Sequence, residues 1–272
     1  MLRALENDMR LYGHLLKMQV RSQVQYKVNL FIDISTYFLV TTLECTVIFL
    51  FFGAFPTLLG WHVGEVALLG AVVSFTFGIA ELFGGGIENF SETIRRGEFD
   101  RTLLRPAGTL IQVASSEFRM RRLGRLTQGA LLFLVALHLL PSLAWTPLKL
   151  VALCFGIISG ATLFMAVMLL GAALCFWTVD TTELTNIFTY GGREIISWPL
   201  DIYSQALQRF FLFVVPLATG LYMPICYILG RPLPLELPGV AVFVSPLAAV
   251  VFAGGSCLVW RLGIHHYESA GG

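Results

Sequence analysis

Charged side chains are scarce in this sequence: Asp, Glu, Lys and Arg make up only 13% of its 272 residues, against about a quarter in a typical soluble domain. Hydrophobic residues make up 56%, and the mean hydropathy is +0.76. A soluble domain of this length would not need so much apolar surface, so the composition favours a membrane protein. The net charge of +1 gives no sign of a nucleic-acid partner, and we expect none.

Motifs of catalysis and nucleotide binding are also missing. GxxxxGK[ST] is absent, so the chain has no phosphate-binding loop of its own. HExxH and GxSxG are absent as well. The five cysteines include no CxxC pair, which argues against a disulfide framework or a cysteine metal site. We therefore expect no catalytic residue, and no cofactor or metal bound by this chain.

Long apolar runs are what the sequence has instead. A helix needs about 20 mostly apolar residues to span a bilayer. Six runs approach or exceed that length, at 28–55, 63–86, 126–143, 147–178, 206–228 and 240–261. The third is short, and proline interrupts the fifth and sixth. These runs predict an all-α integral membrane protein with six transmembrane helices in one domain, residues 1–272.

The basic residues lie almost entirely on one side of the predicted spans. Of the 18 Lys and Arg residues, only Lys149 and Arg231 fall in connections on the other side. Arg193 and Arg209 are placed in the connection between spans four and five. Lys and Arg collect in cytoplasmic loops, so both termini are expected in the cytoplasm and the protein in the cytoplasmic (inner) membrane. The connections at 87–125 and 180–205 are then cytoplasmic, and the one at 229–239 is external.

Two further segments have a recognisable pattern. Residues 1–27 carry apolar side chains at steps of three or four, which predicts an amphipathic helix. We expect it in the cytoplasmic membrane interface, with packing on another protein as the alternative. Six of the 11 prolines lie between 216 and 246. They predict short re-entrant or surface helices there, or an ordinary kinked hairpin.

A few acids and glycines stand out within the spans. Asp33, Glu44 and Glu81 are candidates for a path across the membrane. Glu44 lies near the middle of the first span, and its alternative role is a hydrogen bond to Thr or Ser on a neighbouring helix. For Asp33 and Glu81, hydration near the cytoplasmic face is the simpler interpretation. The glycines at 84–86 are expected to loosen or stop the second span, and GxxxG at 156–160 to pack within the bundle.

The segment "RRGEFDRTLLRP", residues 95–106, is densely charged for so apolar a chain. Its arginines fit contact with anionic lipid, but lipid contact does not account for Phe99, Leu103 and Leu104 between them. An exposed apolar cluster on a charged loop is typical of a partner contact. A regulatory ligand site is a third alternative, with no specific support.

This segment, followed by "SSEFRMRRLGR", resembles the connection between the second and third spans of ABC-2 type transporter permeases. "SWPLDIYSQALQRFFLFVVPLA" and "RLGIHHYESAG" are similar to a branch of ABC-2-like export permeases. The resemblance covers essentially the whole chain. It implies an ABC-2 (type V exporter-like) fold that pairs into a homodimer or heterodimer, each half resting on a separate ABC ATPase subunit that binds ATP and Mg.

The resemblance also implies where the ATPase would couple to this chain. The coupling residues would be Arg96, Gly97, Glu98, Phe99, Asp100, Leu103 and Leu104, with a second cytoplasmic contact at Pro199, Leu200, Asp201 and Tyr203. The expected function is that of an exporter's permease subunit, forming half of a translocation pathway. The alternatives are a secondary transporter or channel without an ATPase and, with no polar cluster to support it, a membrane enzyme.

Overall fold

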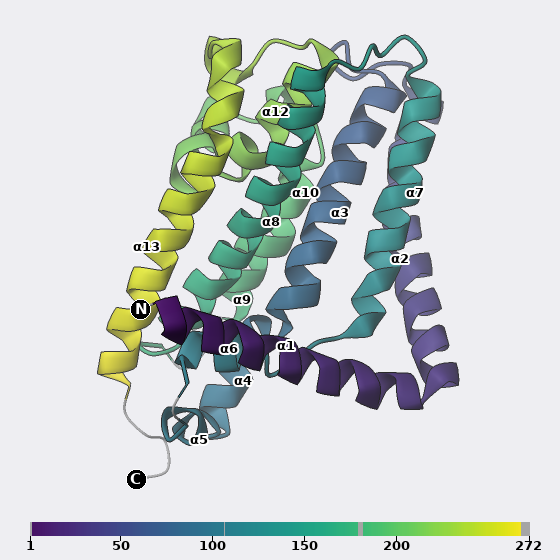
Figure 1. Ribbon diagram of the computed structural model, residues 1–272. Coiled ribbons are helices and arrows are strands. Elements are labelled where there is room, and N and C mark those ends of the chain that lie inside the picture. Colours follow the sequence, from purple (N-terminus) through teal and green to yellow (C-terminus); the bar gives the residue numbers. More distant parts are fainter. Residues whose placement is uncertain (1, 106, 179–181, 268–272) are drawn as a thin grey trace.

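The computed structural model describes residues 2–105, 107–178 and 182–267, and these are almost entirely helical (Figure 1). Four helices contain stretches long and apolar enough to cross a membrane: α2 (Lys27–Ala54), α3 (Val63–Glu88), α8 (Pro147–Leu174) and α13 (Ser245–His266). A bent pair, Gln205–Val214 and Ala218–Leu229, would make a fifth if it counts as one span. The chain is thus a multi-pass membrane protein, and the apolar runs one, two, four and six are confirmed as such helices.

Shorter helical segments complete the chain. The α-helices are α1 (Leu2–Gln25), α4 (Phe90–Arg95), α5 (Phe99–Leu103), α6 (Thr109–Ala114), α7 (Leu123–Leu139), α9 (Thr182–Asn186), α10 (Gly192–Ile196), α11 (Gln205–Arg209) and α12 (Met223–Leu229). Tighter or wider helical turns occupy Met120–Arg122, Ile187–Gly191, Leu200–Ile202, Phe210–Val214, Ala218–Tyr222, Pro234–Glu236 and Gly239–Val244.

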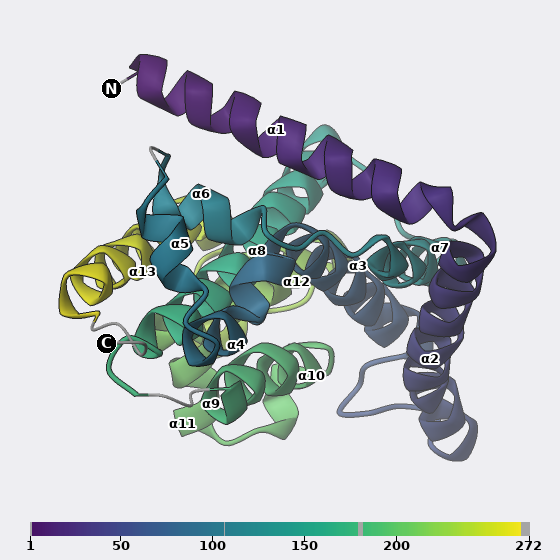
Figure 2. The same ribbon diagram turned by 90° about the horizontal axis from the view of Figure 1, so that it is seen from below.

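The bundle has two distinct ends. We call the end that carries α4, α5 and α6 the basal end, and the end with the loops at 55–62, 140–146 and 230–238 the distal end (Figure 1). Helix α1 lies across the basal end, nearly at right angles to the long helices (Figures 1 and 2). The predicted helix within residues 1–27 is confirmed. It packs on this chain's own basal segment, since the Gln19 amide donates to the Ser115 carbonyl at 2.6 Å and the Gln23 side chain accepts from the Met120 amide at 2.9 Å.

Helix α3 forms the centre of the bundle. Its apolar stretch is 83% buried, whereas that of α2 is only 11% buried. The glycines at 84–86 do not stop this helix, which continues to Glu88. They allow α6 to approach closely instead, because a β-carbon at Gly86 would collide with the carbonyl of Val113.

The GxxxG of α8 packs within the bundle, as the sequence predicts. A β-carbon at Gly160 would collide with the side chain of Leu221, and one at Gly156 would lie 3.1 Å from Pro224. The absence of side chains at these two positions brings the 218–229 segment against α8.

The region of the fifth predicted span is broken, as its interruption by proline predicts. Residues 205–229 do not form a straight helix, because the backbone turns by 84° between Val214 and Ala218, where Pro216 lies. The preceding residues 182–196 form a further helical segment, in which a π-helical turn at Ile187–Gly191 joins α9 to α10. Arg193 lies in this segment, and its side chain is buried among helices of the bundle.

Candidate functional site

Glu44 lies near the middle of α2 and joins three helices. Its Oε2 accepts from Arg193 Nη1 of α10 at 2.9 Å and from Arg125 Nη1 of α7 at 3.3 Å. The alternative that it hydrogen-bonds Thr or Ser on a neighbouring helix is therefore wrong. Two arginines neutralise a carboxylate that would otherwise be costly at membrane depth.

Glu81 of α3 is fully buried, which contradicts the expected hydration at a membrane surface. Arg122 pairs with its Oε1, and Arg125 Nε lies 3.0 Å from its Oε2. The hydroxyl of Tyr37 donates to both oxygens, at 3.1 and 3.2 Å. Arg122 and Arg125 are themselves almost completely buried.

The same contacts continue to the basal end of α3. Arg122 Nη2 lies 2.9 Å from Glu88 Oε2, and the Tyr190 hydroxyl donates to Glu88 Oε1 at 2.6 Å. We call this set of side chains the ion-pair network: Glu44, Glu81, Glu88, Arg122, Arg125 and Arg193, with the hydroxyls of Tyr37 and Tyr190. Its three carboxylates and three guanidinium groups are equal in number. Their mutual attraction offsets the cost of removing these ions from water.

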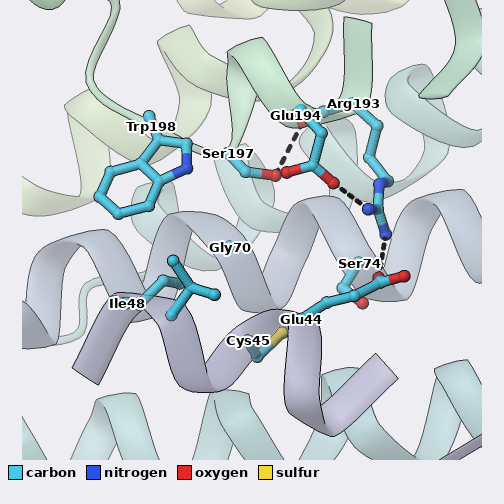
Figure 3. Close-up of a pocket in the computed structure, with 10 residues that line it drawn as sticks. Glu44, Cys45, Ile48, Gly70, Ser74, Arg193, Glu194, Ser197 and Trp198 are labelled. Atoms are coloured by element: carbon cyan, nitrogen blue, oxygen red, sulfur yellow. Dashed lines mark hydrogen bonds and ion pairs between the residues drawn. The ribbon is translucent and has the colours of Figure 1, made fainter. Parts of the chain in front are cut away.

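A cavity of about 320 Å³ opens beside one end of the network, between α2, α3 and the segment that follows α10 (Figure 3). Glu44 and Arg193 belong to both the network and the cavity wall. The remaining lining residues are Cys45, Val47, Ile48, Gly70, Ser74, Glu194, Ser197 and Trp198. Of the three acids singled out in the sequence, only Glu44 lines this cavity. Glu81 lies behind it, and Asp33 is exposed on the surface of α2.

A second, strongly polar depression of about 760 Å³ lies at the basal end. It is lined by Glu88, Asn89, Ser91, Glu92, Thr93, Arg95, Arg96, Glu98, Thr102, Ser116, Glu117 and Arg119. Glu88 belongs to this depression and to the ion-pair network. Ionic contacts therefore run without a break from the basal surface to the cavity inside the bundle.

The segment 95–106, at the basal end, only partly matches the exposed apolar cluster that its sequence predicts. Leu103 and Leu104 are exposed, at 42% and 86%. Phe99 is fully buried, so its expected exposure is wrong. Its ring packs edge-on against Phe90 and Tyr267, with centroids 5.1 Å away in both cases. Phe99 anchors α5 to the bundle and leaves the two leucines on the surface.

The polar residues and the glycine of this segment fix the positions of α4 and α5. Arg96 Nε donates to Glu92 Oε1 at 2.8 Å across one helical turn. Gly97 has a φ of 66°, the left-handed conformation that favours glycine, and reverses the chain between α4 and α5. Asp100 accepts from the Tyr267 hydroxyl at 3.0 Å, which ties α5 to the end of α13. Glu98 lines the basal depression.

The structure does not bring Pro199, Leu200, Asp201 and Tyr203 together with α4–α6. They follow Trp198, whose ring lies 5.7 Å from that of Phe51 near the distal end of α2. Leu200 is fully buried, and Asp201 is exposed. Their expected contact with an ATPase has no support from this placement.

The ion-pair network itself was not predicted, although the sequence carries a signal for it. Arg122 and Arg125 are three residues apart, and Glu81 and Glu88 are seven apart. Both spacings place the charges on one face of a helix, beside an apolar run. For metal binding there is no comparable grouping: the described residues contain no set of three or more His, Cys, Asp or Glu placed to hold an ion.

Comparison with known proteins gives one match. A family model described as "ABC-2 family transporter protein" matches residues 38–271. That range includes every residue of the ion-pair network except Tyr37. It also includes the acidic residues of the cavity and of the basal depression, and the segment 95–106. No curated protein and no solved structure matches the chain.

Proposed function

The chain belongs to the ABC-2 transporter family, and from this premise we propose that it is the permease subunit of an ATP-binding cassette exporter. It forms half of a translocation pathway and is driven by a separate ATPase subunit. ATP and Mg are bound by that partner, in keeping with the lack of GxxxxGK[ST] in this chain.

The proposed topology has six crossings, with the basal end and both termini in the cytoplasm of a cell bounded by its inner membrane. Residues 182–198 make the fifth crossing, and 205–229 form a re-entrant pair reached from the distal side. The distribution of charge supports this orientation, because the basal connection 95–125 is rich in arginine. Helix α1, lying across the basal end, then occupies the cytoplasmic interface.

One observation carries the proposal: the ion-pair network connects the basal depression to the internal cavity. Glu88 lines the first, and Glu44 and Arg193 line the second. Low-dielectric ion pairs resist separation. A displacement of α4–α6 by a docked ATPase would therefore be passed to α2 and α10, which border the cavity.

A second permease subunit, identical or different, would complete the pathway. Helix α2 leaves most of its apolar surface uncovered in the single chain. The uncovered side chains include Phe31, Leu39, Leu43, Val47 and Leu50. In the assembly this face would meet the other subunit or membrane lipid.

The test is affinity purification of the tagged full chain from its native cells in a mild detergent. We expect an ATP-binding subunit to co-purify in about equal amount and to hydrolyse ATP. An unrelated tagged membrane protein purified in parallel is the control. Transport that runs on a proton gradient without ATP, with no ATP-binding subunit in the eluate, would instead indicate a secondary transporter.

A further inference from the structure

We propose that the cavity between α2, α3 and α10 binds an ammonium group carried on an apolar body. This proposal rests on the permease function, since it names the class of cargo that the cavity would accept. It is carried by the arrangement of charges around the cavity, by carboxylate oxygens that have no partner among the described residues, and by apolar side chains in the wall opposite them.

The charges that face the cavity are mainly negative. The side chain of Glu194 is 57% exposed and that of Glu44 is 40% exposed, whereas the Arg193 and Arg125 side chains are only 10% and 4% exposed. The Arg193 guanidinium lies between the two carboxylates and pairs with both (Figure 3). The ion-pair network together with Glu194 contains four carboxylates and three guanidinium groups, which is an excess of one negative charge.

In each of the two exposed carboxylates, only one oxygen takes part in the ion pairs described above. Both ion pairs of Glu44 use Oε2, and the single pair of Glu194 uses Oε1. Glu44 Oε1 and Glu194 Oε2 accept no hydrogen bond from any residue that the structure describes. An N–H donor that carries a positive charge satisfies such oxygens best.

Part of the wall suits an apolar body. Val47, Ile48 and the Trp198 ring line the cavity, and the ring offers a face that attracts cations. The volume of about 320 Å³ lies at the small end of the range for ligand pockets, about 300–1,000 Å³. Glu44 is 10 residues before the end of α2 at Ala54, or about 15 Å along the helix axis. A free amine reaches this depth more readily than a lipid headgroup anchored at the membrane surface.

The test uses three probes with the same ring and different head groups: 2-phenylethylammonium, 2-phenylethanol and 3-phenylpropanoate. Their affinities for the purified full chain are measured by saturation-transfer NMR in phosphatidylcholine nanodiscs, which carry no net charge. We expect the ammonium probe to bind most tightly. Glu194→Gln and Glu44→Gln should each weaken it by at least about tenfold, because hydrogen bonds to charged groups are the stronger ones. Neither should change the affinity for 2-phenylethanol.

Glu236→Gln is the matched control, since it removes an exposed carboxylate of the distal loop away from the cavity and should leave all three affinities unchanged. Phosphatidylethanolamine added to the nanodiscs identifies the source of the ammonium group: displacement of the probe assigns the site to lipid, and retention assigns it to a free amine. Equal binding of the three probes, or an ammonium affinity unchanged in both variants, would overturn the proposal. No ATPase is present in this assay, so that failure leaves the permease function standing.

Discussion

Glu81 is the most completely buried ion in the part of the chain that the structure describes, and two arginines hold it there. Its side chain has no exposure, and that of Arg122 has 6%. Removing one partner of such a pair leaves an uncompensated charge, which costs about 3–5 kcal/mol. An exposed pair is worth only about 0–1 kcal/mol. Stability should therefore respond very differently to arginines that lie close together in the sequence.

We predict that Arg122→Gln and Glu81→Gln each lower the midpoint of thermal unfolding of the purified chain. The double variant should be less destabilised than the sum of the two, because it leaves equal numbers of Arg and Glu in the network. Arg96→Gln is the control: its side chain is 64% exposed, and its loss should change the midpoint little. Additive losses, or equal effects of Arg96→Gln and Arg122→Gln, would contradict this description of the network.

The sequence identifies Glu44 because an acid within an apolar run is conspicuous. It does not identify Arg193, the partner 149 positions away, because Arg193 follows a polar stretch that has the composition of a connection. The side chain of Phe99 was misplaced for a related reason. Its position on a charged loop predicts exposure, but four aromatic rings from α4, α8 and α13 regions surround it.

Among the helices, hydropathy locates the apolar ones, whether they are exposed like α2 or buried in the bundle like α3, and it fails for a segment whose polar side chains are paired with other helices. The first two runs, 28–55 and 63–86, agree closely with α2 and α3. Residues 182–196 are helical as well, but they include Thr, Asn, Arg and Glu. A hydropathy scale assigns each of these the cost of an isolated polar group, whereas pairing with Glu44 lowers that cost for Arg193. The bent 205–229 pair has the opposite composition, and its apolar run with an internal proline predicts a span that is interrupted.

For helix α5 and the turn after it, effects on stability and effects on ATPase association can be distinguished. Leu103→Ser together with Leu104→Ser should leave abundance and unfolding temperature near those of the native chain, because both side chains are exposed. Association with the ATPase should weaken, since burial of each leucine in an interface contributes about 1.5–3 kcal/mol. Co-purification yield of the ATP-binding subunit is the measurement.

Phe99→Ser provides the contrast on the same helix. Truncating a buried aromatic side chain costs about 3–5 kcal/mol of folding free energy. This variant should therefore unfold at a lower temperature, whether or not its coupling to the ATPase changes. If the leucine pair destabilises the chain as much as Phe99→Ser does, the leucines are structural and the contact surface lies elsewhere.

On the scale of the whole molecule, the bundle has a polar basal end and an apolar middle that holds one charged cavity. The order of the long helices along the chain could be predicted from the apolar runs. The internal ionic connection could not, because its charged members come from α2, α3, α7, α10 and the turn at Met120–Arg122, and the registry between helices is set by packing. The glycines of α3 and α8 fix part of that registry through close approach.

Site-specific photo-crosslinking can show whether the basal end receives the ATPase. A crosslinker is placed at Leu104 on the basal end or, as control, at Leu59 in the distal loop; both side chains are exposed, at 86% and 64%. After irradiation of cells, we expect an adduct between the chain and an ATP-binding subunit from position 104 and none from position 59. An adduct from position 59, or none from position 104 when the ATPase co-purifies, would contradict that expectation.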